Sequence, residues 1–216
     1  ALFGVSVSQI NLLIDTVLAS LLETGSVTWL YYSDRLVELP LGIFAIAIGT
    51  VILPSLSKTH VTASPAEFSR TLDWGVRLVI LVGLPAALAL SVISEPLLAA
   101  LFLYGDFTLF DVEQSAASLR AYAFGVVAFM LIKILAPGFF ARQDTRTPVK
   151  IGIIAMVANM VLNLILVWHL RHVGLALATA LSAWLNAFLL WRGLSLAGFY
   201  TPTPSWWRQL ARIGVA

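Results

Sequence analysis

Long apolar runs separated by short polar stretches make up most of this sequence. About 20 consecutive apolar residues form a helix long enough to cross a bilayer. The runs therefore predict an all-α, polytopic membrane protein with six transmembrane helices, at about 2–22, 28–57, 74–103, 116–140, 148–169 and 173–196. A short turn around residues 169–174 separates the last two runs, so these are expected to form an antiparallel hairpin.

The composition agrees with a membrane protein. The 216 residues are 60% hydrophobic and 11% charged, with a mean hydropathy of +0.93, whereas about 25% of the residues of a soluble protein are charged. The six helices use nearly all of residues 1–197, which leaves no room for a soluble catalytic domain. Residues 198–216 are expected to be an extended segment and the start of an interfacial or further transmembrane helix. Because the chain begins without Met and stops just after this new helix begins, we expect it to be a piece of a longer protein.

Basic residues gather on one side of the predicted topology. If the six helices alternate in direction, two basic residues, Arg120 and Arg171, fall on one side of the membrane. The other side receives Lys58, Arg70, Arg77, Arg142, Arg146, Lys150, Arg192, Arg208 and Arg212. Since cytoplasmic loops are enriched in Lys and Arg, the loops at 58–73 and 141–148 and the tail after 192 are expected in the cytoplasm. The basic pI therefore reflects topology and does not indicate a nucleic-acid partner.

Three charged residues, Asp34, Arg35 and Glu38, interrupt the second apolar run. A charge within a membrane span is costly and usually faces a cavity or a partner. Arg35 offers a planar fork of N–H donors that suits the oxygens of a phosphate, and it stays protonated. Asp34 and Glu38 would orient Arg35 and offset its charge in the absence of a ligand. The alternative is a self-neutralising cluster that only holds two helices together.

A second group of polar residues is dispersed over three of the predicted helices. Asp15 lies in the first, Asn159 and Asn163 lie one turn apart in the fifth, and Thr179 lies in the sixth. If they converge, they supply the hard oxygen ligands that Na⁺ prefers, or Asp15 could carry a proton. Ordinary hydrogen bonding between helices is the alternative.

Lys133 lies deep in the fourth predicted helix. Its side chain could provide a second phosphate contact in a cavity. Equally, its aliphatic stem could extend along the helix and place the ammonium group at the membrane surface. The tryptophans, Trp29 among them, fit the aromatic belts found at membrane interfaces.

Several long blocks of the sequence resemble the MurJ/MviN family of lipid II flippases, in the family's order. The most specific block is 136–150, APGFFARQDTRTPVK. The others are 4–15, GVSVSQINLLID, 29–40, WLYYSDRLVELP, 49–57, GTVILPSLS, and 104–108, YGDFT. Together they span essentially the whole chain.

This resemblance implies a fold with two helical lobes around a central cavity, within the multidrug/oligosaccharidyl-lipid/polysaccharide exporter superfamily. The chain would correspond to helices seven to twelve, and the missing N-terminal lobe would be its partner. The family moves undecaprenyl-diphosphate-linked peptidoglycan precursor, lipid II, across the bacterial plasma (inner) membrane. No cofactor is expected beyond coupling to Na⁺, to H⁺ or to the membrane potential.

The resemblance also assigns roles to particular residues. Arg35 falls on the family's cavity arginine, with Asp34 and Glu38 on the neighbouring acids. A sodium site of the family would fall on Asp15, Asn159, Asn163 and Thr179. One of these positions can be acidic in relatives, whereas Asn163 is neutral, so weaker cation binding is expected here.

Three other functions are compatible with a polytopic helical chain. One is another exporter of the same fold, either a drug/cation antiporter or a polysaccharide-unit flippase. Another is a non-transporting membrane scaffold for cell-wall enzymes. The third is an enzyme acting on lipid-linked sugars, although the sequence offers no recognisable acid/base pair for it. The Arg35 group and the 136–150 block favour the lipid II flippase.

Overall fold

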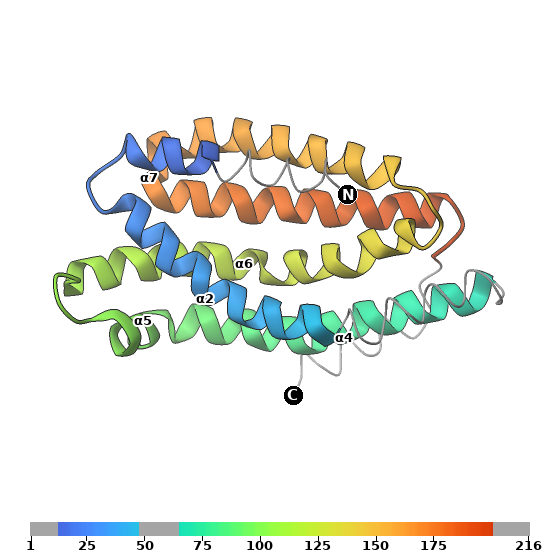
Figure 1. Ribbon diagram of the computed structural model, residues 1–216, viewed down its shortest axis with the longest axis horizontal. Helices are drawn as coiled ribbons and strands as arrows, with labels where there is room; N and C mark the ends of the chain where they lie inside the picture. The colour runs from blue at the N-terminus through green and yellow to red at the C-terminus, as the bar shows by residue number, and fades with distance from the viewer. Residues whose placement is uncertain (1–12, 48–64, 201–216) are drawn as a thin grey trace.

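The computed structural model describes residues 13–47 and 65–200, and this part of the chain is helical with no strand. Residues 13–20 form a short helical segment. The helices that follow are α2 (Ser26–Ala47), α4 (Pro65–Val92), α5 (Ser94–Phe102), α6 (Leu109–Phe140) and α7 (Arg146–Leu196). Figure 1 shows the long helices running roughly side by side along the longest axis of the molecule, with α2 crossing α6 obliquely. The predicted all-α class is confirmed for the described residues.

Helix α7 is a hairpin of two antiparallel arms. Its backbone leaves helical geometry at Arg171 (φ 51°, ψ −131°), and the second arm returns along the first in Figure 1. The arms approach closely at Gly174, where an added Cβ would lie 2.6 Å from the carbonyl oxygen of Leu166. At 1.5 Å per residue each arm is about 38 Å long, which exceeds the hydrocarbon thickness of about 30 Å. The predicted hairpin around 169–174 is therefore confirmed.

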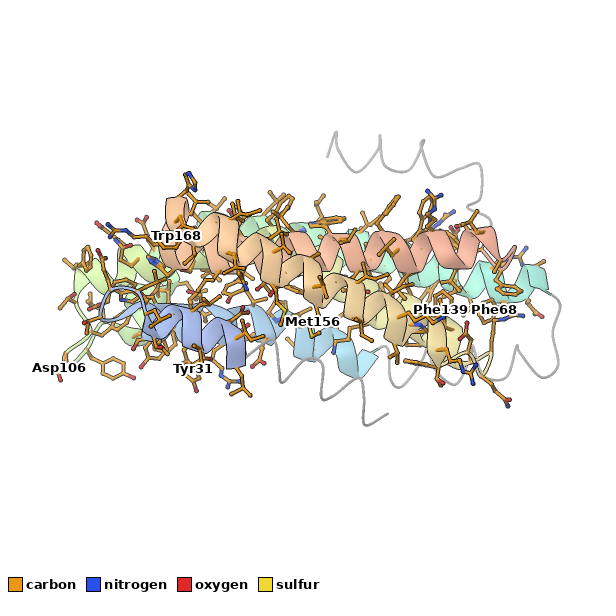
Figure 2. The ribbon with its side chains drawn as sticks, turned by 90° about the horizontal axis from the view of Figure 1, so that it is seen from above. Tyr31, Phe68, Asp106, Phe139, Met156 and Trp168 are labelled. Atoms are coloured by element: carbon orange, nitrogen blue, oxygen red, sulfur yellow. The ribbon has the colours of Figure 1, made fainter. Side chains whose placement is uncertain are left out.

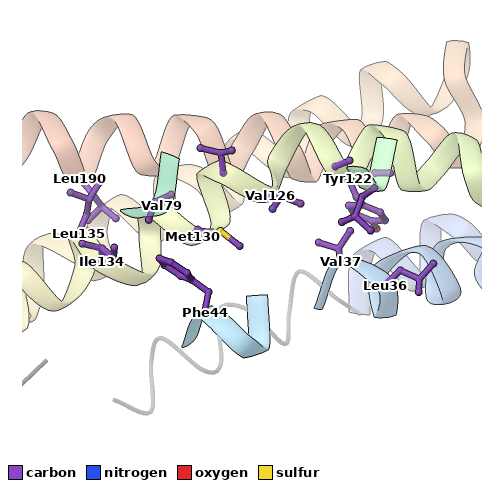
Figure 3. Close-up of a cluster of buried hydrophobic side chains, with 14 of the residues drawn as sticks. Leu36, Val37, Phe44, Val79, Tyr122, Val126, Met130, Ile134, Leu135 and Leu190 are labelled. Carbon is purple, nitrogen blue, oxygen red and sulfur yellow. The ribbon is translucent and has the colours of Figure 1, made fainter. Parts of the chain in front are cut away.

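Helix α6 is the central element, and it packs against α2, α4, α5 and α7. A Cβ added at Gly125 would lie 2.9 Å from Cα of Ala180, so glycine allows α6 and the second arm of α7 to touch. Figure 3 shows part of the core between α2 and α6: Val37 of α2 lies near Tyr122, and Phe44 of α2 points towards Met130. Because α2 lies over α6, only one flank of α2 is covered.

Helix α6 begins at Leu109, seven residues before the predicted start at 116. The prediction was wrong because it treated Asp111 as part of a loop. Thr108 and Asp111 instead form a capping box. The Asp111 carboxylate accepts a bond from the Thr108 backbone N–H at 2.8 Å, and the Thr108 hydroxyl accepts one from the Asp111 N–H at 3.3 Å. Such caps satisfy N–H groups that have no partner within the helix.

The predicted helix at 74–103 is two helices in the structure. Helix α4 begins at Pro65 and runs on into the predicted span, as Pro65 and Glu67 in its first turn favour, and α5 begins at Ser94. The break falls at Ile93 because Pro96 has no N–H to donate to the carbonyl of Val92 and its ring crowds that group. Pro85, in contrast, is accommodated inside α4.

Three helices of the described part are long and apolar enough to cross a membrane. They cover Ala66–Val92, Leu109–Phe140 and Arg146–Leu196. The last of these contains both arms of the hairpin. The structure thus supports a multi-pass membrane protein, but it does not by itself reproduce the predicted count of six.

The distribution of charged residues differs between the two ends of the molecule. Figure 1 places the turns near 21–25, 103–108 and 171 at one end and the loop at 141–145 at the other. The two basic residues predicted on the poorly basic side are both paired with acids, as Arg171 binds Glu23 and Arg120 binds Glu95. This geometry is consistent with the charge asymmetry read from the sequence.

The loop at 141–145 and the residues after α7 are held together at the other end. Asp144 accepts bonds from the backbone N–H groups of Arg146 and Thr147 at 3.1 and 3.0 Å, and bonding to Thr147 lowers the pKa of Asp144. The Arg142 guanidinium stacks on the ring of Phe199. The Tyr200 hydroxyl donates to Asp73 of α4 at 3.1 Å. These contacts tie residues 199 and 200 to the rest of the molecule; residues 201–216 of the predicted 198–216 segment lie outside the described residues.

Candidate functional site

The N-terminal half of α2 is fixed to its neighbours by buried polar contacts. The Trp29 indole N–H donates to Asp111 Oδ1 at 2.7 Å, and the Ser33 hydroxyl donates to a carbonyl, either that of Ser115 in α6 at 2.7 Å or that of Trp29 at 2.6 Å. The Trp29 ring also packs on the ring of His172, with centroids 4.8 Å apart. Trp29 is therefore a buried anchor between α2, α6 and α7 and not the interfacial tryptophan that the sequence predicted.

The opposite flank of α2 carries an exposed row of side chains, which we call the Arg35 stripe: Tyr31, Arg35 and Glu38. Positions i, i+4 and i+7 share one face of a helix. Arg35 Nη1 pairs with Glu38 Oε2 at 2.5 Å, and the two side chains are 54% and 53% exposed. The Arg35 guanidinium also lies over the Tyr31 ring, 4.9 Å from its centroid. Arg35 is thus held by its own helix and presented outward.

Asp34 does not share the exposure of Arg35. Its side chain is half-buried, and its neighbours on that flank of α2, Leu30 and Val37, are buried. The ion pair of Arg35 in the described part of the chain is with Glu38. The carboxylate of Asp34 lies close enough to Glu38 and Arg35 on one side, and to Asp15 on the other, for the charges to interact. The structure therefore places Asp34 between the two groups predicted from the sequence.

Lys133 is exposed on α6, and the structure does not bring it to Arg35. The bond between Ser33 and Ser115 fixes which part of α6 lies beside Arg35. Lys133 is 18 residues further along α6 than Ser115, which corresponds to about 27 Å along the helix axis. The two basic side chains are too far apart to bind one phosphate group, so any phosphate contact of Lys133 would be separate from that of Arg35.

The second predicted group does converge. We call it the Asp15 cluster: Asp15, Asn159, Asn163 and Thr179. Asn163 Nδ2 donates to Asp15 Oδ1 at 2.6 Å and to Asn159 Oδ1 at 3.0 Å, and Asn159 Nδ2 lies 3.3 Å from Thr179 Oγ1. Thr179 Oγ1 is in turn 3.5 Å from Asp15 Oδ2. Residues from the first helical segment and from both arms of α7 therefore meet at one point.

The chemistry of the Asp15 cluster suits a small hard cation. Its side chains present carboxylate, amide and hydroxyl oxygens, and both asparagines are fully buried. The oxygen Oδ1 of Asn163 is buried without a hydrogen-bond partner, although buried polar atoms are nearly always satisfied. An oxygen left unsatisfied beside a carboxylate is the arrangement expected where a cation binds, so the residues present fit that role.

One residue of the Arg35 stripe, Tyr31, was not identified as functional from the sequence. Its spacing of four residues from Arg35 was the available signal, since residues four apart are neighbours on a helix. The signal is weak, because aromatic residues are common in membrane helices and the sequence alone does not tell an exposed flank of a helix from a lipid-facing one.

Comparison with known proteins identifies the family. A family model described as "Lipid II flippase MurJ" matches residues 1–216. The chain belongs to the MurJ family of flippases. It is 58% identical over its whole length to a probable lipid II flippase MurJ of Vibrio cholerae and 47% identical, over 99% of its length, to a lipid II flippase MurJ of Burkholderia cenocepacia. In both cases the chain spans 41% of the relative, so it corresponds to about two fifths of a full-length family member.

Solved structures agree with this assignment. A lipid II flippase MurJ in an inward closed conformation matches 89% of the chain and 41% of its own length, with a TM-score of 0.82 and 26% identity. An outward-facing multidrug resistance transporter of the MATE family, a member of the MOP superfamily, matches 94% of the chain with a TM-score of 0.71. The second match is 18% identical and shows a shared fold. The resemblance to the MurJ/MviN family, predicted from sequence blocks, is confirmed.

Proposed function

We propose that this chain forms one lobe of a lipid II flippase and crosses the bacterial inner membrane six times. The two arms of α7 would be two of the crossings. The first segment, α2 and α6 would supply one crossing each, and α4 and α5 together would supply the sixth. The poorly basic end would face the periplasm and the loop at 141–145 the cytoplasm, in keeping with the positive-inside rule. The rest of the protein would supply a second lobe, and a central cavity would lie between the two.

The observation that carries this proposal is the exposed Arg35 side chain on α2, in a chain that belongs to the MurJ family. Moving lipid II requires a diphosphate to cross about 30 Å of hydrocarbon. The free-energy cost of this step is prohibitive unless other groups replace the water that hydrates the diphosphate. Arg35 can replace part of that shell with charge-assisted hydrogen bonds, which are about twice as strong as neutral ones. Glu38 limits the positive charge of the site before the substrate arrives.

Transport would follow from alternating access. The diphosphate and its sugar-peptide head would be held in the water-filled cavity, while the prenyl tail stays in the lipid. Rocking of the two lobes would then open the cavity to the other side, as in other two-lobed transporters.

The Asp15 cluster would couple a cation to this movement. Asp15, Asn159, Asn163 and Thr179 would hold Na⁺, or Asp15 would carry a proton, and the bound charge would balance the carboxylate at the junction of the first segment with α7. The membrane potential could bias a step that moves charge by about 2.3 kcal/mol per charge per 100 mV.

The substrate assignment is tested with the full-length protein reconstituted in vesicles. We expect it to move lipid II between leaflets faster than a polyprenyl-linked polysaccharide unit that shares the diphosphate, and not to move a cationic drug. Preferential movement of the polysaccharide unit or of the drug would assign the protein to another exporter class. Binding of lipid II without movement between the leaflets would favour a scaffold.

A further inference from the structure

Two neighbours on α2 fix the position of the Arg35 guanidinium. Glu38, three positions later, binds one of its nitrogen atoms at 2.5 Å. Tyr31, four positions earlier, places its ring under the guanidinium carbon at 4.9 Å from the ring centroid. The first contact is an ion pair that an incoming anion competes with, whereas the second combines the ring with the Tyr31 hydroxyl, which also interacts with the guanidinium.

The Tyr31 ring is itself held by a row of aromatic residues. Tyr31 meets Tyr32 edge to face, with centroids 5.7 Å apart, and Tyr32 packs on Phe102 of α5 at 4.3 Å and on Phe107 at 5.3 Å. Aromatic pairs prefer such tilted and edge-to-face geometries. In Figure 2, Tyr31 lies at the edge of the molecule, in the half that also contains Asp106. The row therefore connects an exposed ring on α2 to the fixed junction between α5 and α6.

We propose that Tyr31 is a positioning residue for Arg35: its ring, braced by Tyr32, holds the guanidinium in the orientation that receives the diphosphate of the substrate. This inference rests on the proposed function and adds a residue to its site. A free arginine side chain has many rotamers, and ordering it reduces the affinity that it provides. Tyr31 orders the side chain before the substrate arrives, because its side chain lies against the guanidinium on the same face of α2.

The test uses the full-length protein and measures lipid II binding and transport. Tyr31→Leu is expected to raise the Kd for lipid II by about two- to fivefold, the range of an exposed cation–π contact. The maximal transport rate is expected to change less than the Kd. Tyr31→Phe keeps the ring and is expected to bind within twofold of wild type. Tyr104→Leu is the matched control, because Tyr104 is an exposed tyrosine in the turn after α5, and it is expected to bind like wild type.

Combining Tyr31→Leu with Arg35→Ala separates positioning from direct contact. If Tyr31 acts through Arg35, Tyr31→Leu weakens binding in the wild-type protein and has no further effect once Arg35 is alanine. An equal loss in both backgrounds would overturn the positioning role, and so would wild-type binding by Tyr31→Leu or weak binding by Tyr31→Phe. If Arg35→Ala weakens binding but Tyr31→Leu does not, this inference fails alone; if Arg35→Ala binds like wild type, the proposed role of Arg35 fails.

Discussion

The Arg35 stripe and the Asp15 cluster differ in where their contacts come from. Arg35 is held by Tyr31 and Glu38, within one turn of its own helix on either side. Asp15 is held by Asn163 and Thr179, which are 148 and 164 residues away in the sequence. The three members of the first group lie on one helix, α2, whereas the second group exists only when the first segment and both arms of α7 are packed together.

Because of this difference, substitutions in the two groups are expected to affect transport and stability differently. An exposed ion pair contributes about 0–1 kcal/mol because water and salt screen it, so the Arg35 stripe can be changed with little effect on folding. Removing a partner from a buried cluster leaves an unsatisfied group at a cost of about 1–3 kcal/mol. We therefore expect changes in the stripe to act on substrate, and changes in the cluster to act on both the ion and the packing of helices.

Within the Asp15 cluster, the largest effect is expected from Asp15→Asn, which removes the one carboxylate of the cluster. Coupling between two sites is commonly 1–3 kcal/mol, so transport driven by the cation should fall by about tenfold. Transport by the full-length protein would be measured in sodium and in choline, each at two pH values. If Asp15→Asn keeps the wild-type response to both sodium and pH, the cluster does not couple a cation to transport.

Asn163→Ala should have the next largest effect, and it acts on stability. The change removes the donor to Asp15 and Asn159, which is expected to lower the free energy of unfolding by about 1–2 kcal/mol. Thermal unfolding of the purified full-length protein measures the loss. Leu164→Ala is the control, because the adjacent Leu164 is exposed on the same helix, and its effect should be smaller. Equal effects of the two variants would show that the hydrogen bonds of Asn163 add little.

Glu38→Gln should have the smallest effect on stability. The pair with Arg35 is more than half exposed, so thermal unfolding should shift by no more than about 0.5 kcal/mol. Transport should fall by a few fold, because the guanidinium loses one of its two fixed neighbours. A large loss of stability would contradict the view that the stripe is independent of the packing of the lobe.

The sequence predicted the helices best where hydrophobicity alone determines them. The hairpin around 169–174 followed from two apolar runs and a short polar turn, and the structure confirms it. The early start of α6 and the break at Ile93 were missed because each depends on a local signal, the Thr108–Asp111 cap and Pro96, that lies inside or beside an apolar run.

For the sites, residue types were predictable but their partners were less so. The resemblance suggested the four members of the Asp15 cluster, and the structure brings them together. The charge of Asp34 does interact with Arg35, but its partial burial was not predictable, because it depends on which side of α2 the neighbouring helices cover. For Lys133, the distance from Arg35 depends on the register of α2 on α6, which the sequence does not encode locally.

The central claim is that the Arg35 guanidinium binds the diphosphate of the substrate during transport. The most direct measurement is movement of lipid II between leaflets by full-length Arg35→Ala, with its amount in the membrane and its thermal unfolding matched to wild type. The account predicts that transport falls at least tenfold, given about 1.5–3 kcal/mol for each hydrogen bond to a charged group, and that Arg35→Lys recovers only part of it because an ammonium group lacks the planar fork. Wild-type transport by a folded Arg35→Ala protein would contradict the claim.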